Sequence, residues 1–248
     1  MPKVAIEECK NLAILRLDNG VINAISPDLV DDLSAALKQV KDEFYGIVLA
    51  GGVKFFSIGF SLPDLLRLDR AGMANFIYNF SEAAFDFLAL PMPTACAIAG
   101  HAIAAGSILA LMSDYRFAAS GKKLIGLNEV KLGLPAPYLA DLMLRQIVGD
   151  RAATDMLYRG EFIASSEAQR IGLIDEILTD DKVEARALEK IAELASLPRH
   201  AFADIKANRI AGARLMYEEN YRSKTEYFLD CWFSEPTQEL LTEAGRKF

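Results

Sequence analysis

The chain has few of the residues that build disulfide frameworks and metal centres. Its three cysteines, Cys9, Cys96 and Cys231, lie far apart in the sequence and form no CxxC pair. This spacing argues against a disulfide framework, and it predicts a reducing compartment, the cytoplasm. Only two histidines are present, His101 and His200, and they are too widely separated to predict a histidine-based metal site.

Runs of basic residues are also missing. The chain has 27 Lys and Arg residues against 34 Asp and Glu residues, which gives a net charge of −7, and the basic residues are spread out. This distribution carries none of the electrostatic footprint of a nucleic-acid-binding protein. We therefore expect no nucleic-acid partner, and any anionic ligand must be held by local groups.

One segment has the length of a membrane span without its other features. Residues 87–112 contain no Asp, Glu, Lys or Arg. However, prolines and glycines interrupt this run, and Asp86 and Asp114 flank it where basic residues are usual. We interpret it as a buried strand followed by a buried helix, so no membrane partner is expected. The N-terminal stretch lacks the apolar region of a signal peptide.

What the sequence does contain is an alternation of strand and helix patterns. Four short apolar segments predict strands: "LAILRL", "YGIVLA", "PTACAIAG" and "DYRFAAS". Between them, amphipathic segments over residues 26–43 and about 73–88 predict helices, the first with Ser26 as N-cap and Pro27 at the first helical position. From about Pro137 the pattern is mostly helical. The order predicts a layered α/β fold with a helical C-terminal part.

Two stretches place small residues between a short strand and a helix start. They are "GGVKFFSIGFSLPDLL", with Gly59 before the helix, and "AGHAIAAGSILALMSDY", with Ala104–Gly106 before an apolar helix. Glycine allows a sharp turn, and the first N–H groups of a helix have no intrahelical acceptor. Two such turns can aim two N–H donors at one oxygen, as in an oxyanion hole. For each turn taken alone, the favoured explanation is a tight strand-to-helix connection in which glycine is needed only for packing.

Taken together, these stretches resemble the crotonase superfamily, also called the enoyl-CoA hydratase/isomerase family. "LAILRLDNGVINAIS" and "LYRGEFIASSEAQRIGLIDEIL" are similar to further segments of that family, so the resemblance covers nearly the whole chain. It implies a crotonase-like ββα superhelix over residues 1–197 and a C-terminal helical region over residues 198–248 that makes trimer contacts. The implied assembly is a homotrimer or a dimer of trimers.

The resemblance also implies the site residues. It puts the two oxyanion N–H groups on Phe60, which follows Gly59, and on Ala105. Family hydratases carry a glutamate three residues after the second of these positions, where this chain has Ile108. The other acid/base glutamate corresponds to Glu129 in "GLNEVKLGL", a phrase that resembles the monofunctional Δ3,Δ2-enoyl-CoA isomerases. The implied activity is isomerisation of an enoyl-CoA of fatty acid metabolism with one glutamate.

Other functions fit the same motifs. An oxyanion hole also serves hydratases, thioester hydrolases and decarboxylases, and a CoA-binding protein without catalysis is a further alternative. Such a silent protein would have no need of Glu129, although without the resemblance Glu129 would be interpreted as a solvated loop residue. An apolar pocket around Glu129 is expected to raise its pKa. The family's usual Asp after the first oxyanion residue is Ser61 here.

The implied substrate carries CoA as part of its thioester, and no separate cofactor or metal is implied. An acidic chain needs a local cation for the CoA phosphates; Lys54 is our candidate, and Lys206 and Lys247 are alternatives. Ordinary structural roles are expected for the other conspicuous side chains: helix start or turn for Asp64 and Asp114, an exposed turn for Glu161, and packing for His101, Phe76, Phe80 and Phe87.

Overall fold

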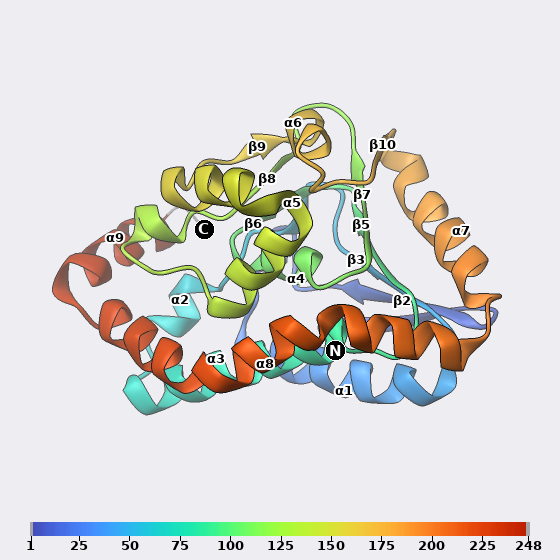
Figure 1. Cartoon of the computed structure of the whole chain (residues 1–248). Coiled ribbons are helices and arrows are strands. Elements are labelled where there is room, and N and C mark those ends of the chain that lie inside the picture. Colours follow the sequence, from blue (N-terminus) through green and yellow to red (C-terminus); the bar gives the residue numbers. More distant parts are fainter. Residues whose placement is uncertain (1, 247–248) are drawn as a thin grey trace.

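A six-stranded sheet forms the centre of the molecule (Figure 1). The computed structural model describes residues 2–246, and the strands of this sheet lie in the order β1–β2–β3–β5–β7–β10. Only β1 runs antiparallel to its neighbour; the other pairs are parallel. The strands are β1 (Val4–Cys9), β2 (Leu12–Leu17), β3 (Ile47–Ala50), β5 (Thr94–Ile98), β7 (Tyr115–Ala119) and β10 (Glu176–Leu178).

A smaller sheet of four strands collects short segments that follow those of the large sheet. Its order is β4–β6–β8–β9, with β4 (Phe55–Ser57), β6 (His101–Ile103), β8 (Leu124–Gly126) and β9 (Ile163–Ala164). After each of β3, β5 and β7 the chain enters the small sheet and then a helical segment. This repeat of two strands and a helical segment is the ββα spiral that the sequence predicts.

Helices surround the two sheets (Figure 1). They are α1 (Pro27–Glu43), α2 (Leu62–Leu65), α3 (Arg70–Leu88), α4 (Ala105–Leu111), α5 (Tyr138–Arg159), α6 (Ser165–Arg170), α7 (Val183–Ala195), α8 (Arg199–Trp232) and α9 (Glu235–Gly245), with 3-10 turns η1 (Glu129–Leu132) and η2 (Asp180–Lys182). The start of α1 is as predicted, because the Ser26 hydroxyl accepts the Leu29 N–H. The α3 helix begins earlier than predicted, where Asp69 caps it by accepting the Gly72 N–H.

Both faces of the large sheet are buried, which explains why its strands appear in the sequence as unbroken apolar runs. In β2, Ala13 and Leu15 belong to the main hydrophobic core, whereas Ile14 packs on the opposite face. That opposite face is covered by α7 through Val183 and Ile191. The main core is enclosed by the large sheet and by helices α1, α3, α4 and α5. The cavity described below is partly lined by residues of this core.

The C-terminal helices pack onto this framework. Buried side chains of α8, among them Ile210, Tyr217 and Phe228, join the main core, and α8 contacts α3 and α5. At the beginning of α8 the buried Lys206 ammonium forms an ion pair of 2.8 Å with Asp114. No helix within residues 2–246 has both the length and the hydropathy of a membrane span.

Candidate active site

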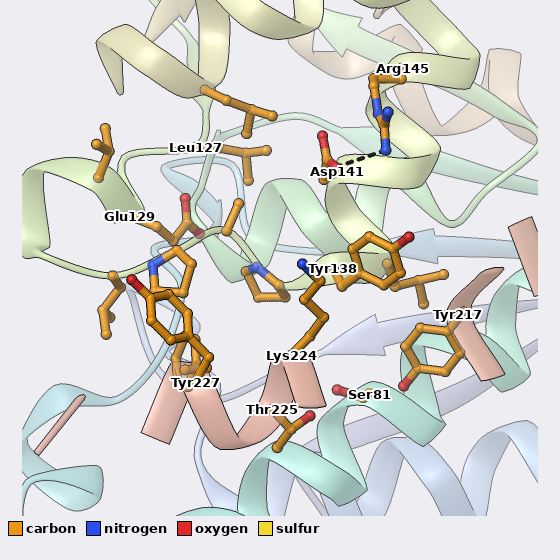
Figure 2. Close-up of a pocket in the computed structure, with 18 of the residues that line it drawn as sticks. Ser81, Leu127, Glu129, Tyr138, Asp141, Arg145, Tyr217, Lys224, Thr225 and Tyr227 are labelled. Atoms are coloured by element: carbon orange, nitrogen blue, oxygen red, sulfur yellow. Dashed lines mark hydrogen bonds and ion pairs between the residues drawn. The ribbon is translucent and has the colours of Figure 1, made fainter. Parts of the chain in front are cut away.

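A cavity of about 610 Å³ lies between α3, α5, α8 and the segment that joins β8 to α5. Most of its wall is apolar or aromatic, with a small number of polar groups. Figure 2 shows Glu129 on one side of this cavity and Tyr217 on the other. A concave apolar site with few polar groups is the usual form of a small-molecule site.

The backbone around Glu129 is fixed by local hydrogen bonds. Glu129 is the first residue of η1, and its carbonyl accepts the N–H of Leu134 at 3.0 Å. The turn ends at Gly133, whose φ of 75° lies in the left-handed region that favours glycine. The Gly133 carbonyl in turn accepts the Thr237 hydroxyl of α9 at 3.2 Å. The C-terminal helix therefore helps to hold the turn on which Glu129 sits.

The Glu129 carboxyl forms no ion pair with any residue in the described part of the chain. Its side chain is buried, and its Oε2 atom has no hydrogen-bond partner within residues 2–246. Burial raises the pKa of Glu129 to about 7, the direction that the sequence predicts. A carboxyl group with a pKa near neutrality can both accept and return a proton. This is the chemical property that the cavity offers.

In the first of the two predicted turns, the Phe60 N–H does not bond to the adjacent backbone segment at Ile25. The Ile25 N–H donates to the Gly59 carbonyl at 2.7 Å, and the Ile25 carbonyl accepts the Ser61 N–H at 2.9 Å. In a parallel bridge of this kind the intervening residue, Phe60, directs its own N–H away from Ile25.

The Phe60 side chain reaches toward the cavity wall. Its ring packs edge-on against Phe76 and Phe80, with centroid distances of 5.0 Å to each. Phe80 lines the cavity, so it belongs both to the aromatic core, as predicted, and to the site.

The second turn adjoins the first. Ala104 has a φ of 49°, and Ala105 is the first residue of α4, so the Ala105 N–H has no intrahelical acceptor. A Cβ atom added to Gly59 would lie 3.0 Å from the Ala104 Cβ and 3.3 Å from the Ala105 nitrogen. Glycine is therefore required at position 59 for two reasons, its φ of 99° and the closeness of the second turn.

The structure thus brings the two predicted amides into neighbouring turns and puts Glu129 in the cavity. Phe60 and Ala105 are not among the residues of the described chain that line that cavity, and the Phe60 ring is the link to it. Ile108 lies in the first turns of α4 and is fully buried in the main core. The catalytic roles of the two amides and of Glu129 stay predictions.

The three candidate cations have different environments. Lys54 is exposed, with its ammonium 5.9 Å from the Phe55 ring centroid. Lys206 is buried and paired with Asp114, so this alternative for a phosphate contact is wrong: its charge is already neutralised inside the core. Lys247 lies outside the described residues.

Other conspicuous side chains have structural roles. Asp114 accepts hydrogen bonds from the Thr94 N–H and hydroxyl, at 2.9 and 3.0 Å, and this pairing joins β5 to the end of α4. His101 packs on Phe55, and its Nδ1 accepts the Leu124 N–H at 3.0 Å. Asp64 accepts the Ser61 hydroxyl at the start of α2, Glu161 is exposed, and Phe76 and Phe87 are buried in the core.

Sequence reasoning missed the contribution of α8 to the cavity. Tyr217 and Tyr221 line it from α8, and Asp141 and Arg145 of α5 form an ion pair of 2.9 Å on its wall. The available signal was the helical spacing of Tyr217, Tyr221 and Phe228, which puts all three on one face. Within residues 2–246 there is no cluster of three or more His, Cys, Asp or Glu that could hold a metal.

The ββα spiral with a helical C-terminal region defines a crotonase fold. The model of the family described as enoyl-CoA hydratase/isomerase matches residues 7–242, and the chain belongs to this family. The crystal structure of human mitochondrial Δ3-Δ2-enoyl-CoA isomerase superposes on it with a TM-score of 0.94 and 25% identity, covering 99% of this chain and 97% of that one.

Similar sequences carry names of both reactions. The chain is 33% identical to a Mycobacterium avium protein named probable enoyl-CoA hydratase echA17, over 79% of this chain and 77% of that protein. It is 29% identical to human enoyl-CoA delta isomerase 1, mitochondrial, over 77% of this chain and 64% of that protein. The protein is therefore an enzyme of a family whose members are named for hydration and for isomerisation.

Proposed function

We propose that the protein is a Δ3,Δ2-enoyl-CoA isomerase that converts 3-enoyl-CoA into 2-enoyl-CoA. The observation that carries this proposal is the buried carboxyl of Glu129 on the wall of an apolar cavity, whose Oε2 atom has no hydrogen-bond partner among the described residues 2–246. Ile108 stands where the resemblance implies a second glutamate for hydratases, and an isoleucine cannot transfer a proton or orient water.

One carboxylate is enough for this reaction. Glu129 takes a proton from C2 of the substrate, and the C2–H electron pair enters a dienolate whose charge sits mainly on the thioester oxygen. The same carboxyl then returns the proton to C4, so that the double bond moves from C3=C4 to C2=C3. No atom is gained or lost, and no redox partner or separate cofactor is needed. A pKa near neutrality serves both steps.

The backbone N–H groups of Phe60 and Ala105 are proposed to stabilise the dienolate oxygen. The support is that the two turns adjoin, that the Phe60 N–H is directed away from Ile25, and that the Ala105 N–H has no intrahelical acceptor. Such donors act on charge that develops in the transition state, and the loss of one typically costs about 2.7–4 kcal/mol.

The CoA moiety of the thioester needs a cation near the entrance of its site, and we propose Lys54 for this role. Lys54 is exposed, and a second cation, Lys123, lies near it. Burial is the largest cause of the lowered pKa of His101, and the positive charges of Lys123 and Lys54 lower it further. Two cations therefore lie near one histidine. Lys123 is partly committed to Asp180, at 3.2 Å, which leaves Lys54 as the better candidate.

We further propose a homotrimer or a dimer of trimers that works in a reducing compartment such as the cytoplasm. Several apolar side chains of α8 remain exposed in the single chain, with Ile205 at 61%, Leu215 at 67% and Met216 at 45%. All three cysteines are free thiols. Light scattering at micromolar concentration tests the assembly, and a monomer would contradict it.

The reaction is tested by an absorbance assay with purified protein and enoyl-CoA substrates of several lengths. Conversion of 3-enoyl-CoA creates a conjugated thioester and raises the absorbance, whereas hydration of 2-enoyl-CoA removes it. We expect isomerisation with much weaker hydration. The hydratase name of the Mycobacterium avium relative makes hydration the second candidate. Fast hydration without measurable isomerisation would decide in its favour.

A further inference from the structure

The side of the cavity away from Glu129 carries hydroxyl groups. Figure 2 shows Tyr217 of α8 and Ser81 of α3 there, with the Tyr217 hydroxyl directed toward Ser81. Tyr221 and Thr225 line the cavity from the same face of α8. The end of the cavity that would hold the far end of an acyl chain is therefore not purely apolar.

Two of these hydroxyls are buried without a partner. The Tyr217 side chain is 5% exposed, and neither its hydroxyl nor that of Tyr221 forms a hydrogen bond within residues 2–246. Ser81 lies near enough to lower the pKa of both tyrosines, and Thr225 near enough to lower that of Tyr221, but none of these contacts has the geometry of a hydrogen bond. Burying an unsatisfied hydroxyl is unfavourable, and phenylalanine would fill the same space without that cost.

Packing fixes where these hydroxyls point. The Tyr217 ring stacks on Phe85 with a centroid distance of 5.6 Å and an interplanar angle of 9°, and it contacts the Tyr221 ring at 5.0 Å. The Tyr221 ring also packs against the Tyr78 ring, with a centroid distance of 6.2 Å. Rings locked in this way present their hydroxyls in fixed positions, which is the arrangement of a preorganised binding group.

We propose that the acyl group of the substrate carries a neutral oxygen, a hydroxyl or a keto group, near its end away from the thioester, and that the hydroxyls of Tyr217 and Tyr221 bind it. The proposal rests on the proposed function, since it takes the cavity to hold the acyl chain that Glu129 acts on. It deepens that function by naming a class of substrate, an enoyl-CoA with a polar chain end.

The charges around the two tyrosines favour a neutral group over a carboxylate. Burial raises the pKa of Tyr217 and of Tyr221, so both remain neutral hydrogen-bond donors. Glu82 acts on both tyrosines with its negative charge, which would repel a terminal carboxylate. Two cations line the cavity within residues 2–246: Arg145 is paired with Asp141, and the Lys224 ammonium lies over the Tyr138 ring, 5.5 Å from its centroid.

The test is direct binding of matched pairs of saturated acyl-CoA thioesters, measured by calorimetry. Within each pair the chains are equally long and end in a methyl group or a hydroxyl group. At the chain length that reaches the tyrosines we expect the wild type to bind the hydroxyl form at least about tenfold more tightly, because the two buried donors are otherwise unpaired. Equal binding of both forms at every length, or binding of neither, overturns the proposal.

Variants assign the preference to the two hydroxyls. Tyr217→Phe and Tyr221→Phe should each weaken binding of the hydroxyl form by roughly two- to tenfold and leave the methyl form unchanged. Tyr78→Phe is the matched control, because Tyr78 is half exposed, contacts the Tyr221 ring and does not line the cavity. It should keep the preference. A preference that survives both cavity substitutions contradicts the assignment.

The thermal midpoint of the unliganded protein separates a binding role from a structural one. Tyr217→Phe breaks no hydrogen bond of the fold, so its midpoint should equal or exceed that of the wild type. A clear fall would mean that the hydroxyl supports the fold, and the proposal would be abandoned. Because binding needs no turnover, selective binding without isomerase activity refutes only the reaction, and isomerisation without selectivity refutes only the polar subsite.

Discussion

The two turns that carry Phe60 and Ala105 and the cavity wall that carries Glu129 solve the same problem by different means. Each must present a polar group inside an apolar core. The turns do so with backbone N–H groups, which bear only partial charges. The wall does so with a carboxyl group that, within residues 2–246, has no counter-ion and leaves one oxygen without a hydrogen bond. The free-energy cost of the turns is therefore backbone strain at Ala104, and the cost of the wall is the desolvation of the Glu129 carboxyl group.

The two costs differ in how they depend on pH. Ala104 holds a φ of 49°, a conformation that costs a non-glycine residue of order 1–3 kcal/mol. Glu129 has its pKa raised to about 7, so its cost depends on pH and appears only when it ionises. A change in the turns should thus act at every pH, whereas a change at Glu129 should act differently above and below neutrality.

The largest expected effect comes from removing the carboxyl group. Glu129→Gln is nearly isosteric, so the fold and the affinity for substrate should survive, while kcat for 3-enoyl-CoA should fall about 10²–10⁴-fold. The loss should appear in kcat more than in KM, because it belongs to the transition state. Steady-state kinetics of both proteins on one substrate measure it. A variant with near wild-type kcat would show that another base does the work.

Removing one amide donor should have the next largest effect. Ala105 is at the first position of α4, where proline is tolerated, but the preceding residue must be able to precede a proline. We therefore compare the double variant Ala104→Gly with Ala105→Pro against Ala104→Gly alone. Loss of the Ala105 N–H should lower kcat about 10²–10³-fold relative to the single variant.

The matching control is the circular dichroism spectrum and thermal midpoint of both variants. If the double variant is folded and retains the kcat of Ala104→Gly, the Ala105 amide is not an oxyanion donor and the role of that turn is packing alone.

The pH profile of the wild type should show the ionisation of Glu129. The base must be ionised to take the C2 proton, so kcat/KM should rise about tenfold per pH unit below the pKa of about 7 and level off above it. A profile that is flat between pH 5 and pH 8 would contradict the raised pKa or the role of Glu129 as base.

Stability should respond to the same group with the opposite sign. The pKa of Glu129 rises on folding from 4.5 to about 7, so between these values the folded state binds the extra proton. The contribution of Glu129 to stability is therefore greatest below pH 4.5 and is lost as pH rises through 7. Glu129→Gln should stabilise the protein above pH 7 by up to about 3 kcal/mol and give no gain below pH 4.5. Denaturant unfolding at two pH values measures this difference.

The smallest effect is expected for relief of the strained turn. Ala104→Gly removes the penalty of a positive φ but makes the unfolded chain more flexible, so the net gain should be about 1 kcal/mol at every pH. Urea unfolding at pH 5 and pH 8 checks it. A gain that changes with pH would mean that the substitution acts through Glu129 and not through the backbone.

Long elements of the fold could be predicted from the sequence because each one carries its own pattern. The run "LAILRL" became β2, and the capping signal at Ser26 became the start of α1. The strands of the small sheet could not be predicted, because they have only two or three residues and show no period. They exist because spiral winding pairs them with strands from distant parts of the chain.

The site divides in the same way. Sequence by itself determined the motif positions, namely the small residues beside Phe60 and Ala105, an isoleucine at position 108 and a glutamate at position 129. Each of these depends on a few adjacent residues.

Only the tertiary structure decided the rest. It buried Lys206 against Asp114. Among the described residues it also left an oxygen of Glu129 and the Tyr217 hydroxyl, on opposite sides of the same cavity, without a hydrogen-bond partner. The physical reason is that burial and pairing depend on which face of α8 packs against α3 and α5. That choice is made by contacts between residues far apart in sequence, which no local pattern records.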